Sequence, residues 1–133
     1  YLGLYVTECT EHLEALGRDL VEIEKERRPE RRFAELVDSM FRHAHSVKGM
    51  SASMGFEATA TLAHRIEDLV DAVRTDPGLL SRDLVDLLRI HVRKEEAIVF
   101  SVAEHVLPEP TLQRIAERLE HPHPPNAGGV TPE

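Results

Sequence analysis

Three residues between positions 45 and 49 have a possible chemical role and lie on one side of a helix. His45 is followed by Lys48 three positions later and by Gly49 four positions later, so the three are neighbours on a helical surface. An imidazole is a nucleophile, and a lysine beside it supplies positive charge to a phosphoryl group on the ring. A glycine inside a helix costs roughly 1 kcal/mol relative to alanine, which indicates that a partner needs room to approach the imidazole.

A second histidine and a carboxylate, His64 and Glu67, lie three positions apart in the next helical segment. A short break joins the two segments, so we expect antiparallel neighbouring helices with this pair facing His45. A carboxylate that accepts a hydrogen bond from the Nδ1–H of an imidazole fixes its tautomer and leaves the lone pair on Nε2. Attack on a γ-phosphate requires a histidine in that state.

Each of these residues alone has an ordinary explanation. A histidine at the rim of a helix is usually a solvated or packing residue, and an isolated pair such as His64 and Glu67 adds only a few tenths of a kcal/mol to a helix. The combination of both groups with Gly55 and Phe56 between them favours a functional site.

The apolar residues predict the helices that must position this site. They recur at spacings of four and three, which is typical of helices with one buried face. The first helix begins at Leu2 and is expected to end near Arg28 and Pro29, because proline disfavours the helical conformation of its predecessor. The second is expected to break over residues 53–56, and the third to stop at residues 76–78.

Two further helices are predicted after that stop. Ser81 is a good N-cap for a fourth helix, whose apolar pattern continues to Leu107 before Pro108. Thr111 is expected to cap a short fifth helix. The predicted fold is therefore all-α, an antiparallel up-down four-helix bundle with an additional C-terminal helix over residues 1–120. Residues 121–133, rich in proline and glycine, are expected to be a flexible linker or tail.

Length and composition narrow the class of protein. A chain of 133 residues is one domain by length, and its net charge of -8 disfavours nucleic-acid binding. The single cysteine, Cys9, excludes an internal disulfide and fits a reducing compartment. No apolar run approaches the length of a membrane span. We expect a cytoplasmic domain without membrane insertion, and the start at Tyr1 rather than Met suggests a fragment of a longer chain.

The motif resembles that of histidine phosphotransfer (HPt) domains, specifically the N-terminal domain of CheA-type chemotaxis histidine kinases. The family pattern Arg-x-Ala-His-Ser/Thr-x-Lys-Gly, followed by Gly-Phe, is similar to residues 42–49 and 55–56. The downstream pattern of His, Glu and Leu-Leu/Val-Asp is similar to residues 64–71. The resemblance covers roughly residues 1 to 90. His43 departs from the commoner alanine and, lying on a different side of the helix from His45, is interpreted as incidental.

This resemblance implies roles and partners. His45 would accept the phosphoryl group, Glu67 would hold its other ring nitrogen, and Lys48 and His64 would complete the hydrogen-bonding network. The donor would be an ATP-binding kinase domain, and the acceptor an aspartate of a response-regulator receiver domain. The sequence has no nucleotide-binding motif, so we expect ATP to bind the kinase domain, no cofactor to bind here, and the chain not to be an enzyme by itself.

His91 and Glu95 support an alternative. They resemble the His-x-x-x-Glu pair of hemerythrin-like helical domains, and residues four apart can share one metal ion. A di-iron site needs more ligands from other helices, and the first two helices offer only scattered candidates such as Glu8 and His12, without the expected spacing. The alternatives to a relay domain are therefore a metal-binding helical sensor and an inactive domain that only docks partners. The intact residues around His45 argue against the latter.

Overall fold

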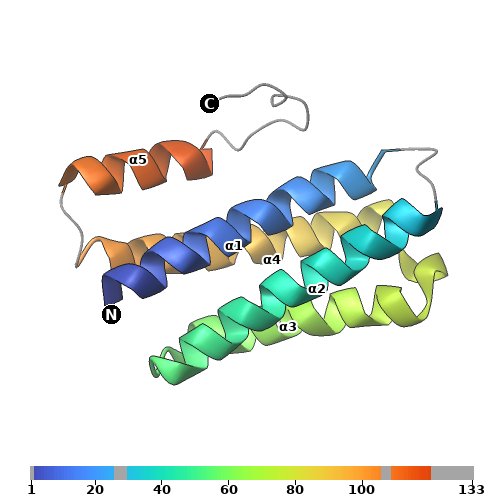
Figure 1. Ribbon diagram of the computed structural model, residues 1–133, viewed down its shortest axis with the longest axis horizontal. Helices are drawn as coiled ribbons and strands as arrows, with labels where there is room; N and C mark the ends of the chain where they lie inside the picture. Colours follow the sequence, from blue (N-terminus) through green and yellow to red (C-terminus); the bar gives the residue numbers. More distant parts are fainter. Residues whose placement is uncertain (1, 26–29, 106–108, 121–133) are drawn as a thin grey trace.

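Four long helices surround an apolar core in the computed structural model of the protein (Figure 1). The structure describes residues 2–25, 30–105 and 109–120. The helices are α1 (Leu2–Ile23), α2 (Glu30–Ser53), α3 (Glu57–Thr75), α4 (Arg82–Ala103) and α5 (Glu109–Glu120), with a 3-10 turn η1 (Pro77–Leu79) before α4. These residues contain no strand, so the predicted all-α class is confirmed. None of the described helices is long and apolar enough to cross a membrane.

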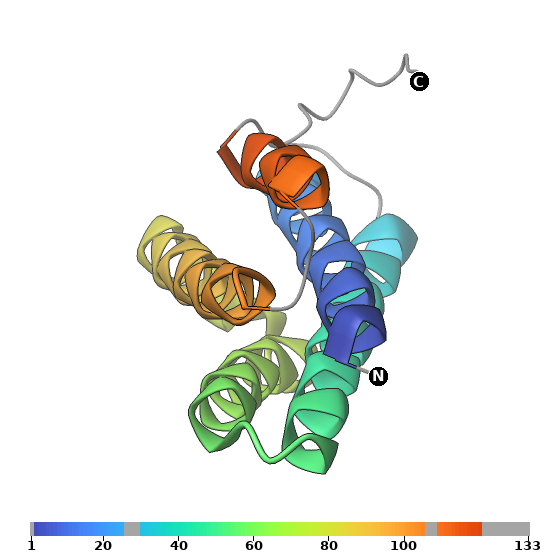
Figure 2. The ribbon, with the colours of Figure 1, turned by 90° about the vertical axis from the view of Figure 1, so that its left-hand side faces the viewer.

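Each long helix packs against two others. The interfaces α1–α2, α2–α3, α3–α4 and α4–α1 form a closed ring around the core, and α5 lies outside it beside α4 and α1 (Figure 2). Aliphatic side chains dominate the core, because aromatic residues make up only 5% of the chain. Its largest fully buried apolar side chains include Leu13, Leu16, Leu20, Ile23, Leu36, Met40, Ile66 and Leu88.

The turn between α2 and α3 sets the alignment of the two helices that carry the site. Gly55 has a φ of +80°, a conformation that a residue with a Cβ rarely adopts. Its N–H donates to the carbonyl of Ala52, and the N–H of Phe56 donates to that of Ser51, which is a Schellman motif. The Phe56 ring then packs against Tyr5 of α1, with the centroids 5.2 Å apart. The predicted break over residues 53–56 is therefore confirmed.

The end of α1 differs from the prediction. The helix ends at Ile23, five residues before Arg28. The N–H of Lys25 donates to the carbonyl of Glu22, three positions back, so the chain tightens into a turn and leaves the α-helical path. Residues 26–29, which include the proline expected to end the helix, lie outside the described residues.

The start of α4 agrees with the prediction, but its end does not. The hydroxyl of Ser81 accepts a hydrogen bond from the N–H of Leu84 at 3.2 Å, so the predicted cap is confirmed. The helix ends at Ala103 rather than Leu107, because the N–H of His105 turns back to a carbonyl three residues earlier. Residues 106–108 lie outside the described residues.

Thr111 does not cap α5. The helix begins at Glu109, so Thr111 lies within its first turn, and the prediction of a cap was wrong. Pro110 explains the earlier start, because its fixed φ and missing N–H are tolerated in the first turn of a helix. The predicted linker over residues 121–133 lies outside the described residues.

One carboxyl group lies in the apolar core. Glu95 of α4 is 0% exposed, and neither of its carboxyl oxygens has a hydrogen-bond partner in the described part of the chain. Burial raises the pKa of Glu95 to about 8. The side chain is therefore accommodated as a neutral acid at neutral pH, since an unpaired buried carboxylate is strongly unfavourable.

We expect the free energy of unfolding to fall as the pH rises from about 4.5 to about 8. The unfolded chain releases the Glu95 proton near pH 4.5, whereas the folded chain holds it to about pH 8. Stability is therefore full below the unfolded pKa and declines until the folded pKa is passed. The fall attributable to Glu95 is on the order of 4 kcal/mol. Urea unfolding between pH 4.5 and pH 8.5 measures it.

The matched variant is Glu95→Gln, which keeps the shape of the side chain and cannot ionise. Glu96, whose pKa burial raises to about 7, remains in the variant and gives a fall of the same sign. The variant should therefore lose less stability over this pH range than the wild type. An equal loss in both proteins would contradict the assignment to Glu95.

Candidate functional site

Three of the predicted site residues meet where α2 faces α3. The Nδ1–H of His45 donates to Glu67 Oε2 at 2.5 Å, and Lys48 Nζ donates to Glu67 Oε1 at 2.6 Å. One carboxylate of α3 thus holds two side chains of α2, one with each oxygen. Contact between Glu67 and the ring nitrogen was expected from the sequence, and the structure contains it.

Burial and charge act on Glu67 in opposite directions. Its side chain is only 7% exposed, and this burial alone raises its pKa. The hydrogen bonds from Lys48 and His45 outweigh that effect, so the pKa of Glu67 lies below its usual range. The carboxylate is therefore ionised at neutral pH, and it holds the ammonium and the ring through charge-assisted hydrogen bonds.

The ionised carboxylate dictates the tautomer of His45. A carboxylate only accepts hydrogen bonds, so the ring nitrogen that contacts it must carry the hydrogen. In the neutral ring this leaves the lone pair on Nε2. Because 62% of the His45 side chain is exposed, this second nitrogen is accessible to a reactant. The site therefore presents an oriented, accessible nucleophile.

His64 lies beside this cluster and does not contact the imidazole among the described interactions. Its Nε2 is 3.5 Å from Asp68 Oδ1, one helical turn along α3, and both side chains are exposed. A ring nitrogen of His64 and an oxygen of Glu67 lie within 4.8 Å of each other. The role of His64 in the network around His45 therefore remains a prediction.

Gly49 borders an open groove next to His45. A Cβ built on Gly49 would meet nothing within 4 Å, so nothing within the described domain requires a glycine at this position. The groove lies between α1 and α2 and has a volume of about 690 Å³. Its walls mix apolar and polar side chains: Leu4, Tyr5, Glu8, His12, His45, Ser46, Gly49, Met50, Ser53 and Met54.

Sequence reasoning missed two residues that contact or flank this site. The ring of Phe41, one turn before His45 on α2, is stacked with the imidazole at a centroid distance of 6.1 Å and an interplanar angle of 13°. The guanidinium carbon of Arg74 on α3 lies 4.0 Å from the Phe41 centroid. The spacing of four between Phe41 and His45 was a usable signal, whereas the position of Arg74 depends on the α2–α3 alignment.

From the sequence, His43 is interpreted as incidental, but the structure shows that it contacts His12. Its Nδ1 is 2.8 Å from Nδ1 of His12, so one ring donates to the other across the α1–α2 interface. Burial, together with the nearby His12, Arg42 and Arg18, lowers the pKa of His43. This hydrogen bond joins α1 to α2 at the side of the His45 groove.

The two residues of the alternative metal site are placed differently from each other. Glu95 is enclosed in the core, and the Nδ1–H of His91 donates to the carbonyl of Leu87 at 2.8 Å. Within the described ranges, the one group of three possible metal ligands is His64, Glu67 and Asp68 on α3. Among the residues that the structure describes, no third ligand lies with His91 and Glu95.

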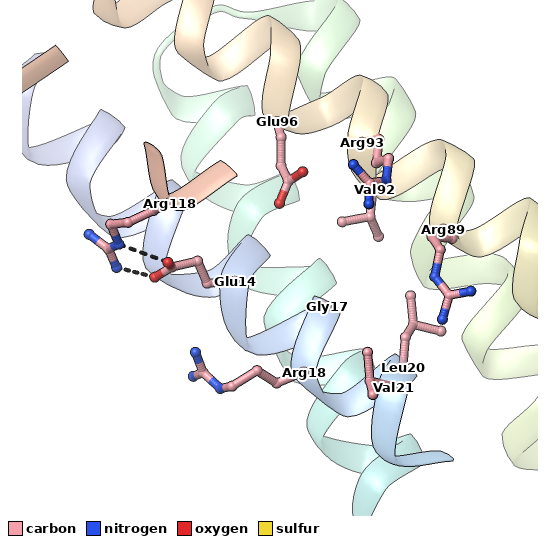
Figure 3. Close-up of a pocket in the computed structure, with 10 residues that line it drawn as sticks. All are labelled: Glu14, Gly17, Arg18, Leu20, Val21, Arg89, Val92, Arg93, Glu96 and Arg118. Carbon is pink, nitrogen blue, oxygen red and sulfur yellow. Dashed lines mark hydrogen bonds and ion pairs between the residues drawn. The ribbon is translucent and has the colours of Figure 1, made fainter. Parts of the chain in front are cut away.

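A second, smaller cavity lies away from the His45 cluster. It has a volume of about 80 Å³ between α1 and α4, and Figure 3 shows the ion pair of Arg118 with Glu14 at its edge. Arg118 Nε donates to Glu14 Oε2 at 2.7 Å, which holds α5 against α1. The lining residues are Glu14, Gly17, Arg18, Leu20, Val21, Arg89, Val92, Arg93, Glu96 and Arg118, none of them from the His45 cluster.

Comparison with known families agrees with this geometry. The model of the Hpt domain family matches residues 1–97, and the chain belongs to that family. The match extends beyond the predicted limit near residue 90 and includes most of α4 with His91 and Glu95. The alternative of a separate hemerythrin-like ancestry for this helix is therefore disfavoured.

Curated proteins that are similar to the chain include chemotaxis proteins named CheA. The chain is 41% identical over 87 residues to chemotaxis protein CheA of Listeria monocytogenes, which covers 65% of this chain and 13% of that protein. It is 34% identical over 104 residues to CheA of Bacillus subtilis, covering 78% and 15%. For CheA of Halobacterium salinarum the identity is 38% over 86 residues, covering 65% and 12%. The matched segment spans less than a sixth of each relative, and no solved structure matches the chain significantly.

Removal of the Glu67 carboxylate should weaken the preference of the His45 ring for the Nδ1–H tautomer. In the wild type, the neutral ring should carry its hydrogen on Nδ1, and Glu67→Ala should shift the population towards the Nε2–H form. Long-range proton–nitrogen NMR of the imidazole distinguishes the two forms. The matched control is Asp68→Ala, an exposed carboxylate one position further along α3. The same tautomer ratio in Glu67→Ala and the wild type would contradict the proposed effect of the carboxylate.

Proposed function

We propose that His45 accepts a phosphoryl group from a kinase domain that binds ATP, and that it passes the group to an aspartate of a response-regulator receiver domain. The proposal rests on one observation: the bond from His45 Nδ1 to Glu67 leaves Nε2 free on an exposed side chain. The relatives named chemotaxis protein CheA support a place in chemotaxis-like two-component signalling in the cytoplasm.

The chemistry divides between this domain and its partners. Nε2 of His45 attacks the γ-phosphorus of ATP, the bond from phosphorus to the bridging oxygen breaks, and ADP leaves with that electron pair. The positive charge that develops on the ring is stabilised through Nδ1–H by the Glu67 carboxylate. In the second step an aspartate oxygen of the receiver attacks phosphorus, and the phosphorus–nitrogen bond breaks.

The domain contributes position and charge to both steps. Lys48 neutralises part of the Glu67 charge and places a cation near the ring within a chain of net charge -8. ATP is held by the kinase domain in this scheme, and the domain needs no cofactor of its own. By itself it is a phosphorylated relay module and not an enzyme.

Replacement of His45 should abolish phosphorylation. Incubated with a cognate kinase domain and ATP, the wild type should acquire phosphate that is labile in acid and stable in alkali, and His45→Gln should acquire none. His43→Gln is the matched control, since it removes a nearby imidazole and keeps the proposed nucleophile. Acid-labile label on His45→Gln would disprove the assignment of the acceptor.

Adding a side chain at Gly49 should raise the free energy of unfolding but lower the rate of phosphorylation. Gly49→Ala should raise the free energy of unfolding by up to about 1 kcal/mol, because alanine is the better helix former and its Cβ has space. The same variant should slow phosphorylation by the kinase domain, and Gly49→Leu should slow it further, because the groove beside His45 becomes narrower.

Gly17→Ala is the control for that experiment. Gly17 is also a helical glycine with nothing within 4 Å of an added Cβ, but it borders the second cavity. It should stabilise the domain similarly and leave the phosphorylation rate unchanged. If Gly49→Leu is phosphorylated as fast as Gly17→Ala, partner clearance is not the reason for the glycine.

A further inference from the structure

We propose that Phe41 and Arg74 are positioning residues, which together fix the plane of the His45 ring for phosphoryl transfer. This inference rests on the proposed function of His45. It adds to the hydrogen bond from Glu67 a second constraint, supplied by an aromatic ring of α2 and a guanidinium of α3.

The hydrogen bond to Glu67 alone does not define the orientation of the imidazole. The ring is joined to the helix through Cβ, and the hydrogen bond restrains one edge of it. Small rotations about the Cα–Cβ and Cβ–Cγ bonds that keep Nδ1 near the carboxylate are still possible. The lone pair of Nε2 lies in the ring plane, so any such rotation changes the direction of attack. Since reactivity depends steeply on the alignment of the reacting atoms, a site with an exposed nucleophile needs a second restraint.

Phe41 supplies a restraint of the required kind. Its ring and that of His45 are nearly parallel, with an interplanar angle of 13° and centroids 6.1 Å apart. Offset stacking of aromatic rings is favourable at separations of 4.5–7 Å. A parallel neighbour opposes rotation of the imidazole about the Cβ–Cγ bond, because that rotation tilts the ring out of the stacked orientation.

Arg74 in turn holds Phe41. The guanidinium lies over the Phe41 ring with its central carbon 4.0 Å from the centroid, which is the geometry of a cation–π contact. Asp71 of α3 accepts a hydrogen bond from Arg74 at 2.7 Å, and Asp38 of α2 lies 3.6 Å away. The guanidinium therefore connects the two helices on the same side as the acceptor histidine.

The exposure of these groups argues for more than packing. Phe41 is only partly buried against the core, and the Arg74 side chain is 42% exposed. A ring that served the core alone would have no need of an exposed cation on one side and an exposed imidazole on the other. The chain of contacts runs from Arg74 through Phe41 to His45, and it ends at the proposed nucleophile.

The test compares variants of the 133-residue protein with a cognate kinase domain and ATP. Phe41→Leu keeps an apolar side chain and removes the ring, and it should lower the phosphorylation kcat about tenfold with little change in KM for this domain. Phe41→Tyr keeps the ring and should restore most of the rate. Arg74→Gln, at an exposed position, should lower kcat by about threefold, and Arg74→Lys by less, because lysine keeps the cation.

A second readout separates positioning from stability. NMR relaxation of the His45 ring should show larger motion in Phe41→Leu and Arg74→Gln than in the wild type. Phe100→Leu is the matched control, because it removes a partly buried ring that packs against the core from α4. Circular dichroism establishes whether each variant is folded. If Phe41→Leu is unfolded, the positioning role is tested by Arg74→Gln alone.

The experiment distinguishes failure of the positioning role from failure of the proposed function of His45. Wild-type kcat in folded Phe41→Leu or Arg74→Gln, with unchanged motion of the His45 ring, would overturn the positioning role. If the wild type itself accepts no phosphate on His45, the proposed function fails and the positioning role fails with it. In that case the relaxation data still establish whether the stack restrains the ring.

Discussion

The organisation of the site depends on one carboxylate that remains ionised in a mostly buried position. Glu67 is stable there because Lys48 and His45 each donate a hydrogen bond to it, which outweighs the cost of burial. That arrangement requires α2 and α3 to be aligned with these residues opposite one another. The Schellman turn at Gly55 and the contact of Phe56 with Tyr5 provide that alignment.

The pKa of a buried carboxyl group in this bundle depends on whether hydrogen-bond donors contact it. Glu67 has two donors, and its pKa is lowered. Glu95 has none in the described residues, and burial raises its pKa to about 8. Burial acts in the same direction at both positions, so the difference comes from hydrogen bonding. The surroundings of Glu95 favour its neutral form, so the side chain would have to lose its proton before it could bind a metal ion.

Features that depend on local spacing were predictable from the sequence. The four-helix bundle, the Ser81 cap and the break at Gly55 follow from periodicity and turn chemistry. The pairing of Glu67 with His45 joins two helices and was predictable because the HPt motif implies it. Contacts between helices outside that motif were not predictable: the Arg74 guanidinium over Phe41 and the bond between His12 and His43 require the alignment of neighbouring helices. Helix ends were misplaced where a local turn, as at Lys25, acts before the proline.

The central claim is that Glu67 holds Nδ1 of His45 so that Nε2 becomes the site of phosphorylation. Phosphorus–nitrogen NMR of the phosphorylated protein, with nitrogen-15 in its histidines, tests it most directly. We expect the phosphoryl group on Nε2 of His45, with the hydrogen still on Nδ1. A phosphoryl group on Nδ1 of His45, or on another histidine, would contradict the account.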